Sequence, residues 1–161
     1  MARTVHDDAS PEFEHFVLVN AAPTRVLAAF VDPRALAAWW QVSRSVVAAR
    51  PMGVFAVEWP PTADADEVLG RLGGVFHGTV MEYLSGRELL VANAWWMPPD
   101  GDPIGPMALE VTCRMSGPVC RLQVRQIGFE DTPRWRRYYA VIANGWRSSL
   151  AALKEHVEQA R

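Results

Sequence analysis

Residues 132–161 read T-P-R-W-R-R-Y-Y-A-V-I-A-N-G-W-R-S-S-L-A-A-L-K-E-H-V-E-Q-A-R, and this stretch decides the fold. Its large apolar residues recur at steps of three and four, which places them on one face of an α-helix. They are Trp135, Tyr139, Ile142, Trp146, Leu150, Leu153 and Val157. Thr132 suits the N-cap position, and Pro133 suits the first turn, where a backbone N–H is not needed. The pattern predicts one long amphipathic helix over 132–158.

Short strands are expected before this helix. The first strand, at 13–20, precedes two short helices, at 22–31 and 33–40, which the Asp32-Pro33 pair separates. Six more strand-like runs lie between turn signals, at about 44–50, 53–59, 74–84, 88–97, 107–115 and 119–128. We therefore expect an α+β fold with a curved antiparallel seven-stranded sheet wrapped around the terminal helix. The acidic loop 60–72 is expected to flank the mouth of a pocket.

The composition is that of a globular protein. Half of the 161 residues are apolar, 21% are charged and the net charge is −2. One domain is expected over 12–161, after a flexible tail at 1–11. Nucleic acid is not an expected partner, because no strongly basic face is evident. No run approaches the roughly 18 apolar residues of a membrane span, and no signal peptide is evident, so we expect a cytoplasmic location and no membrane partner.

Residues 107–128 predict a β-hairpin with one buried face. If Ser116-Gly117 forms a two-residue turn, alternate residues of the two strands share that face. They are Leu109, Val111, Cys113, Met115, Cys120, Leu122 and Val124. Cys113 and Cys120 would then lie opposite each other and point inward. Two buried free thiols are the favoured interpretation, and a structural or redox disulfide is the alternative.

No motif for metal, phosphate or nucleophilic chemistry stands out. The glycine-rich stretch 70–78 fits neither a dinucleotide fingerprint nor a P-loop, and a strand rather than a helix follows it. The histidines lack metal-ligand spacing; they are His6, His15, His77 and His156. No G-x-S-x-G elbow occurs, and neither cysteine has an evident histidine partner. We therefore expect no metal and no cofactor.

Three polar residues fall on apolar faces of the expected strands. The alternation of 74–84 aims Glu82 inward, where burial would raise its pKa and suit a general acid or base. The alternative is that Glu82 pairs with an arginine near the sheet edge. Asn93 and Gln126 can either orient a ligand or satisfy backbone groups.

Seven tryptophans make this small domain unusually rich in rings. Rings on the sheet and on its covering helix can line a cavity, although each alone can equally be core. The candidate ligand-binding residues are Trp40, Phe55, Trp59, Asn93, Trp95, Leu109, Gln126, Trp135, Tyr139, Ile142 and Trp146. Gly145 lowers the stability of the expected helix by about 1 kcal/mol relative to an alanine at the same position. We expect it to let the helix approach its neighbours while Trp146 projects into the cavity and Trp59 and Trp95 form the opposite wall.

The order of elements is similar to the helix-grip fold of the START-like superfamily (SRPBCC). Three stretches resemble the branch named for activators of the Hsp90 ATPase: V-N-A-A-P-T-R-V-L-A-A-F-V-D-P-R-A-L-A-A-W-W (19–40), G-T-V-M-E-Y-L-S-G-R-E-L-L-V (78–91) and G-W-R-S-S-L-A-A-L (145–153). The likeness covers about 13–158. The superfamily holds lipid and polyketide carriers, cyclases, self-resistance proteins and co-chaperone domains, and the fold does not choose among them.

The leading hypothesis is that the chain binds a small hydrophobic molecule, aromatic or polyketide-like, between sheet and helix. One alternative is a polyketide cyclase or hydrolase that uses the same cavity. The other is a co-chaperone module of the Hsp90 type. That partner is disfavoured, because the chain has no separate N-terminal module such as the eukaryotic activators carry. A homodimer is left open.

Overall fold

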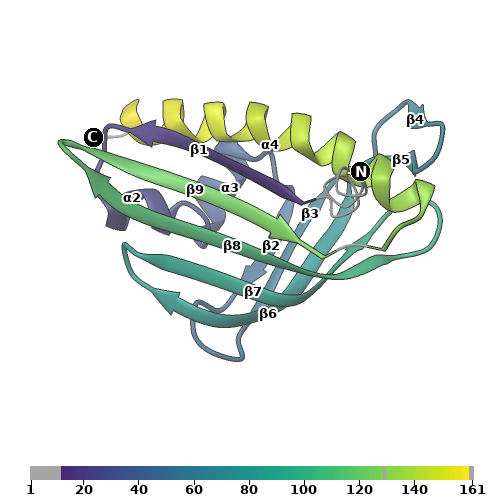
Figure 1. Cartoon of the computed structure of the whole chain (residues 1–161), viewed down its shortest axis with the longest axis horizontal. Helices are drawn as coiled ribbons and strands as arrows, with labels where there is room; N and C mark the ends of the chain where they lie inside the picture. The colour runs from purple at the N-terminus through teal and green to yellow at the C-terminus, as the bar shows by residue number, and fades with distance from the viewer. Residues whose placement is uncertain (1–11, 129, 160–161) are drawn as a thin grey trace, which may run out of the picture.

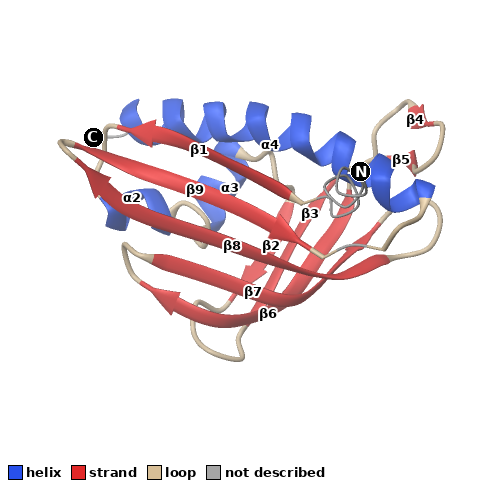
Figure 2. Ribbon diagram, viewed as in Figure 1, coloured by secondary structure: helices blue, strands red, loops and turns tan. Residues whose placement is uncertain are grey.

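A curved antiparallel sheet of seven strands forms the body of this computed structural model, which describes residues 12–128 and 130–159 (Figures 1 and 2). Its strands are β1 (Phe13–Val19), β2 (Arg44–Val47), β3 (Val54–Trp59), β6 (Gly74–Leu84), β7 (Glu88–Met97), β8 (Ile104–Ser116) and β9 (Val119–Ile127). They are ordered β1-β9-β8-β7-β6-β3-β2. The expected α+β fold is confirmed, and the tail expected at 1–11 lies outside the described residues.

Helix α4 (Pro133–Gln159) runs along the sheet, as the periodicity predicts (Figure 1). The Thr132 side chain accepts a hydrogen bond from the backbone N–H of Trp135 at 3.2 Å, which caps the first turn. Its buried residues are Trp135, Tyr138, Tyr139, Trp146, Leu150, Leu153 and Val157. No helix in the described part of the chain combines the length and apolar character that crossing a membrane requires.

The two short helices, α2 (Pro23–Ala28) and α3 (Pro33–Trp39), close one end of the sheet. Asp32 caps α3 by accepting from the N–H of Ala35 at 2.9 Å. Trp39 faces the core and donates from Nε1 to the carbonyl of Ala29 at 2.9 Å, so the two helices are joined. Trp40 follows directly, at the C-cap of α3. This turn at the helix end leaves the Trp40 ring free to face α4.

Register shifts in two central strands reverse the inward and outward alternation. In β7 the shift lies between Val91 and Ala94, and Asn93 between them has a positive φ of 51°. Trp96 therefore points into the core, and Trp95 lies on the opposite side of the sheet. The expectation that Trp95 faces inward is wrong, because a β-bulge changes the period of two on which it rests.

The same effect moves Glu82 in β6. A shift between Val80 and Glu82 pairs Tyr83 with the fully buried Leu89, whereas Glu82 pairs with the half-buried Leu90. Tyr83 packs against the core. The inward position expected for Glu82 is therefore wrong, and with it the physical basis for a role as a buried general acid or base.

The β8–β9 hairpin keeps the expected faces but not the expected register. Ser116 pairs with Val119, so the turn residues are Gly117 and Pro118, and Gly117 takes a positive φ of 65°. Cys120 then opposes Met115 rather than Cys113. The two cysteines are diagonal neighbours and both are buried, free thiols.

The loop at 60–72 contains a small hairpin that the sequence pattern did not predict. Strand β4 (Ala65–Asp66) pairs with β5 (Gly70–Arg71). Asp66 accepts from Arg137 Nε of α4 at 2.8 Å and from the backbone N–H of Leu69 at 2.9 Å. Arg71 forms a bidentate ion pair with Asp100, with both N–O distances 3.0 Å. Two ion pairs thus tie this hairpin to α4 and to the segment after β7.

The burial of both cysteines makes their reactivity a test of the fold. Burial raises the pKa of Cys113 and of Cys120, so little thiolate forms near neutral pH. We expect thiol titration to find no reactive cysteine in the native protein and two after unfolding in denaturant. Two thiols that react without denaturant, or none after unfolding, would contradict this packing.

The Asp66–Arg137 pair predicts how firmly the β4–β5 hairpin is held. Its hydrogen bonds, from Arg137 first and then from Leu69, hold the pKa of Asp66 well below its usual range. A carboxylate with a lowered folded pKa contributes stability above its unfolded pKa of about 3.9 and loses it as the pH falls further. The protection of the amides over 60–73, that is, their exchange rate relative to the unfolded chain at the same pH, should therefore stay constant from pH 7 to about pH 4 and fall below that pH.

Asp66→Asn should speed amide exchange over 60–73 while exchange in β8 and β9 stays unchanged. Asp131→Asn is the matched control, because it removes the neighbouring ion pair with Arg136 at the start of α4, in which no residue of the hairpin takes part. Equal exchange over 60–73 in the two variants would show that the Asp66 pair does not hold the hairpin.

Candidate functional site

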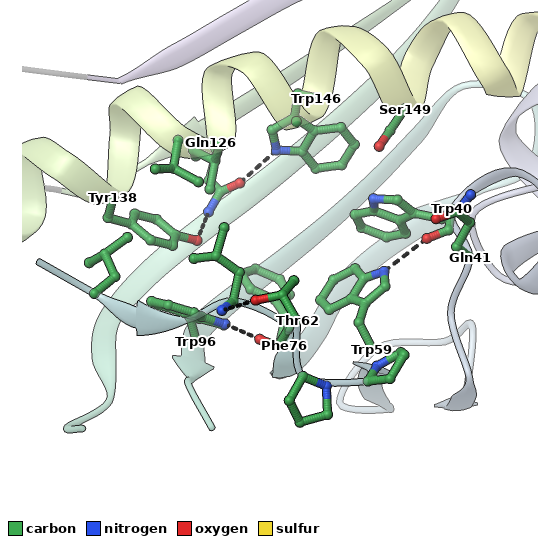
Figure 3. Close-up of a pocket in the computed structure, with 18 residues that line it drawn as sticks. Trp40, Gln41, Trp59, Thr62, Phe76, Trp96, Gln126, Tyr138, Trp146 and Ser149 are labelled. Carbon is green, nitrogen blue, oxygen red and sulfur yellow. Dashed lines mark hydrogen bonds between the residues drawn. The ribbon is translucent and has the colours of Figure 1, made fainter. Parts of the chain in front are cut away.

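A cavity of about 560 Å³ lies between α4 and the sheet (Figure 3). Its lining comes from the end of α3, the end of β3, the loop that follows β3, strands β6, β7 and β9, and the first two thirds of α4. The lining residues are Trp40, Gln41, Trp59, Pro60, Pro61, Thr62, Leu69, Leu72, Gly73, Phe76, Trp96, Gln126, Tyr138, Val141, Ile142, Gly145, Trp146 and Ser149.

Three indoles gather at one end of the cavity. The ring centroid of Trp40 lies 4.9 Å from that of Trp146 and 5.1 Å from that of Trp59. Behind it, Trp39 stacks on Trp40 at 4.9 Å with an interplanar angle of 4°. Helix α3, strand β3 and helix α4 each contribute a ring to this wall, so the end of α3 fixes the distance between sheet and helix.

The other end is built by Trp96, Tyr138 and Phe76. Trp96 and Tyr138 stack with centroids 5.4 Å apart and an interplanar angle of 30°. Phe76 of β6 contacts the buried Phe55 edge to face, with the two ring centroids 6.5 Å apart. Flat faces therefore line both ends of the cavity (Figure 3).

Most of the indole N–H groups are already paired within the protein. Trp59 donates from Nε1 to the carbonyl of Trp40 at 2.9 Å, and Trp96 donates to the carbonyl of Gly73 at 2.7 Å. Trp146 donates to Oε1 of Gln126 at 2.9 Å. These rings consequently offer the cavity apolar faces rather than polar edges.

Gln126 is the buried polar side chain of the site, with 2% of its surface exposed. Its amide nitrogen donates to the Tyr138 hydroxyl at 2.7 Å and to Met107 Sδ at 3.3 Å. Its oxygen accepts from Trp146. One amide on β9 therefore binds two side chains of α4, and Figure 3 shows it between the two rings.

Ionisable groups are scarce in the cavity. Its described lining contains no carboxylate, histidine, lysine, arginine or cysteine, and Tyr138 is its titratable side chain. Burial raises the pKa of Tyr138, so its phenol stays neutral. Within 12–128 and 130–159, no cluster of three His, Cys, Asp or Glu side chains is arranged to hold a metal ion.

Five of the eleven candidate residues line this cavity: Trp40, Trp59, Gln126, Ile142 and Trp146. The structure brings them together from four elements that are distant in sequence. Their role in binding stays a prediction.

The other six candidates lie elsewhere, for three physical reasons. Phe55 and Leu109 are fully buried in the core. Asn93 and Trp95 lie at and beyond the bulge of β7, and the Trp95 indole donates to the Asn93 side chain at 3.4 Å, outside the cavity. Trp135 and Tyr139 stack on each other near the start of α4. None of the six is retained as a cavity-lining residue.

Sequence reasoning missed Tyr138, although a usable signal was present. Tyr138, Ile142, Gly145 and Ser149 recur at steps of four, three and four, which marks a second stripe beside the buried one. Small residues on such a stripe leave space. Gly145 is exposed, and a Cβ atom there would meet nothing within 4 Å, so this glycine borders open space at the cavity edge and does not serve the expected close approach of the helix.

Solved structures share this fold at low sequence identity. A protein of Chromobacterium violaceum is 24% identical with a TM-score of 0.64, over 91% of this chain and 97% of that one. The Aha1 dimer from Colwellia psychrerythraea is 13% identical with a TM-score of 0.64, over 92% and 96%. DynU16, a protein of the dynemicin biosynthetic locus, is 18% identical with a TM-score of 0.66, over 93% of this chain and 48% of DynU16.

No curated protein matches the chain in sequence. The family model described as "Activator of Hsp90 ATPase homolog 1-like protein" matches residues 20–158. This match extends from the loop after β1 to the last turn of α4, so it includes every element that lines the cavity. The fold is the START-like helix grip, and the chain belongs to the family of activator of Hsp90 ATPase homolog 1-like proteins.

Proposed function

We propose that this protein binds a small, flat, largely apolar molecule in the cavity between the sheet and α4. The observation that carries the proposal is a cavity of about 560 Å³ with indole or phenol rings at both ends. Because Trp59, Trp96 and Trp146 have paired N–H groups, a ligand meets their faces without leaving a donor unsatisfied. The volume lies within the range of small-molecule sites.

The energetics favour an aromatic ligand. Burial of apolar surface contributes roughly 25 cal/mol per Å². Each well-placed aromatic pair adds about 0.5–1.5 kcal/mol beyond that burial. Trp40 already makes tilted and edge contacts with Trp146 and Trp59, and these leave ring faces toward the cavity that a flat ligand can cover.

The enzyme alternative has less support from the lining. A cyclase or hydrolase commonly needs a side chain that takes up or releases a proton near neutral pH. Among the described lining residues Tyr138 is the titratable candidate, and burial moves its pKa away from neutrality. Glu82, the sequence-based candidate, does not line the cavity. The geometry therefore favours binding over turnover.

The relatives are consistent with this choice but do not identify a ligand. DynU16, which shares the fold, is a protein of a biosynthetic locus, and a small-molecule role fits that setting. Because the Aha1 dimer shares the fold, two alternatives stay open for this protein: a co-chaperone module and a homodimer. If the cavity binds no small molecule, the co-chaperone alternative becomes the leading hypothesis.

Filling the cavity from Gly145 tests the proposal without removing any contact. Gly145→Leu should raise the free energy of unfolding by about 1 kcal/mol, because glycine is a poor helix former. The new side chain occupies the cavity, so the affinity for fluorene should fall by roughly tenfold or more as buried contact area is lost. Fluorene, a flat tricyclic hydrocarbon, is measured by equilibrium dialysis with protein in excess, and stability by thermal unfolding.

Asn144→Leu is the matched control, since Asn144 is exposed, precedes Gly145 and does not line the cavity. It should leave fluorene affinity unchanged. Equal fluorene binding by both variants and the wild type would mean that the ligand lies elsewhere. Undetectable binding to the wild type would refute the proposed function for hydrocarbons of this shape.

A further inference from the structure

The orientation of the Gln126 amide is determined by its neighbours. An indole N–H can only donate a hydrogen bond, so the oxygen of Gln126 must face Trp146, at 2.9 Å. The amide nitrogen then faces the Tyr138 hydroxyl at 2.7 Å and Met107 Sδ at 3.3 Å. A flipped amide would set two donors against each other at Trp146. Both amide hydrogens and one oxygen lone pair are therefore in use.

This orientation leaves the Tyr138 hydroxyl hydrogen without an acceptor. Since Gln126 Nε2 donates, the Tyr138 oxygen is the acceptor in their bond. None of the hydrogen bonds found among residues 12–128 and 130–159 has the Tyr138 hydroxyl as its donor. Tyr138 is only 4% exposed, and its ring is held against Trp96. A hydroxyl that accepts one hydrogen bond can still donate another, so Tyr138 is able to bind a partner from outside the protein.

The hydroxyl lies where a ligand can reach it. Tyr138 lines the cavity, and Figure 3 shows Gln126 on one side of its hydroxyl oxygen. Because Gln126 donates to this oxygen, the hydroxyl hydrogen is available for a different partner. The phenol stays protonated near neutral pH, because burial raises its pKa. Tyr138 is thus a fixed donor at the end of the cavity formed by Trp96 and Phe76.

We propose that Tyr138 donates a hydrogen bond to an oxygen of the ligand, so that the cavity selects flat aromatic ketones and related carbonyl compounds over hydrocarbons of the same shape. The inference rests on the proposed function of this cavity. A ligand carbonyl can take the place of water as the acceptor for such a hydroxyl, whereas a hydrocarbon cannot restore the hydrogen bond.

Other polar groups of the lining are less suited to this task. Gln41 is exposed at the rim. The Thr62 hydroxyl already donates to the carbonyl of Asp64 at 2.8 Å and accepts from the N–H of Leu72 at 2.9 Å. Ser149 lies beside Trp146 and Trp40, at the opposite end of the cavity (Figure 3). The buried, pre-oriented donor is Tyr138.

The test compares 9-fluorenone with fluorene, which share a tricyclic frame and differ by a carbonyl in place of a methylene. Equilibrium dialysis gives the affinity of each for the wild type, Tyr138→Phe and Tyr139→Phe. Tyr138→Phe should lower the ratio of fluorenone to fluorene affinity roughly three- to tenfold, the effect of one neutral hydrogen bond. Fluorene affinity should change little, because the ring that stacks on Trp96 is kept.

Tyr139→Phe is the matched control in the same helix, because the Tyr139 hydroxyl donates to the carbonyl of Gly128 at 2.6 Å and does not line the cavity. It should leave the affinity ratio unchanged. An equal ratio in all three proteins would overturn the role of Tyr138 while the proposed function stands. If neither compound binds the wild type, the proposed function fails and the inference fails with it.

A spectroscopic measurement covers the case in which Tyr138→Phe does not fold, since that variant deprives Gln126 of an acceptor. The infrared carbonyl stretch of fluorenone bound to the wild type should lie at lower wavenumber than in a hydrocarbon solvent, as a hydrogen-bonded ketone requires. A stretch at the hydrocarbon-solvent value would refute the hydrogen bond.

Discussion

The amide of Gln126 is the constraint on which the site depends. It joins β9 to two residues of α4, Tyr138 and Trp146, which lie about two helical turns apart. A polar group buried this deeply must keep its partners, so both rings are held beside the amide and at a fixed height above the sheet. The Trp40 ring then meets Trp146 from the end of α3. Together these contacts hold α4 and the sheet apart over the cavity.

The rim of the cavity is held differently from its walls. Its walls rest on buried rings and the Gln126 amide, whereas two ion pairs tie the loop 60–73. One joins the buried carboxylate of Asp66 to the half-exposed Arg137, and the other joins Arg71 to Asp100, which are both half-exposed. An ion pair near solvent adds little to the free energy of unfolding, and salt weakens it further. Gly145 leaves the facing stretch of α4 without a side chain. The rim therefore depends more on polar contacts near solvent than the walls do.

The sequence predicted the fold well and the site in part. Two strands, 74–84 and 88–97, have the predicted bounds, and α4 differs by a single residue at each end. Periodicity failed where a local irregularity changed its phase. The bulge at Val80–Glu82 places Tyr83 on the inner face, where Glu82 was expected. The bulge at Val91–Ala94 likewise places Trp96 there, where Trp95 was expected. The loop 60–72 was expected at the pocket mouth, and it contributes lining residues. Tyr138 was missed because its place in the lining depends on how distant segments pack, which one sequence without structure does not specify.

The central claim is that a flat molecule lies among four particular tryptophans, and the indole N–H signals in a ¹⁵N–¹H correlation spectrum test it most directly. The chain has seven such groups. On titration with 9-fluorenone, the signals of Trp40, Trp59, Trp96 and Trp146 should shift and saturate together, because these rings line the cavity. Those of Trp95 and Trp135, which do not line it, should hardly move. Shifts confined to Trp95, or spread evenly over all seven, would contradict the account.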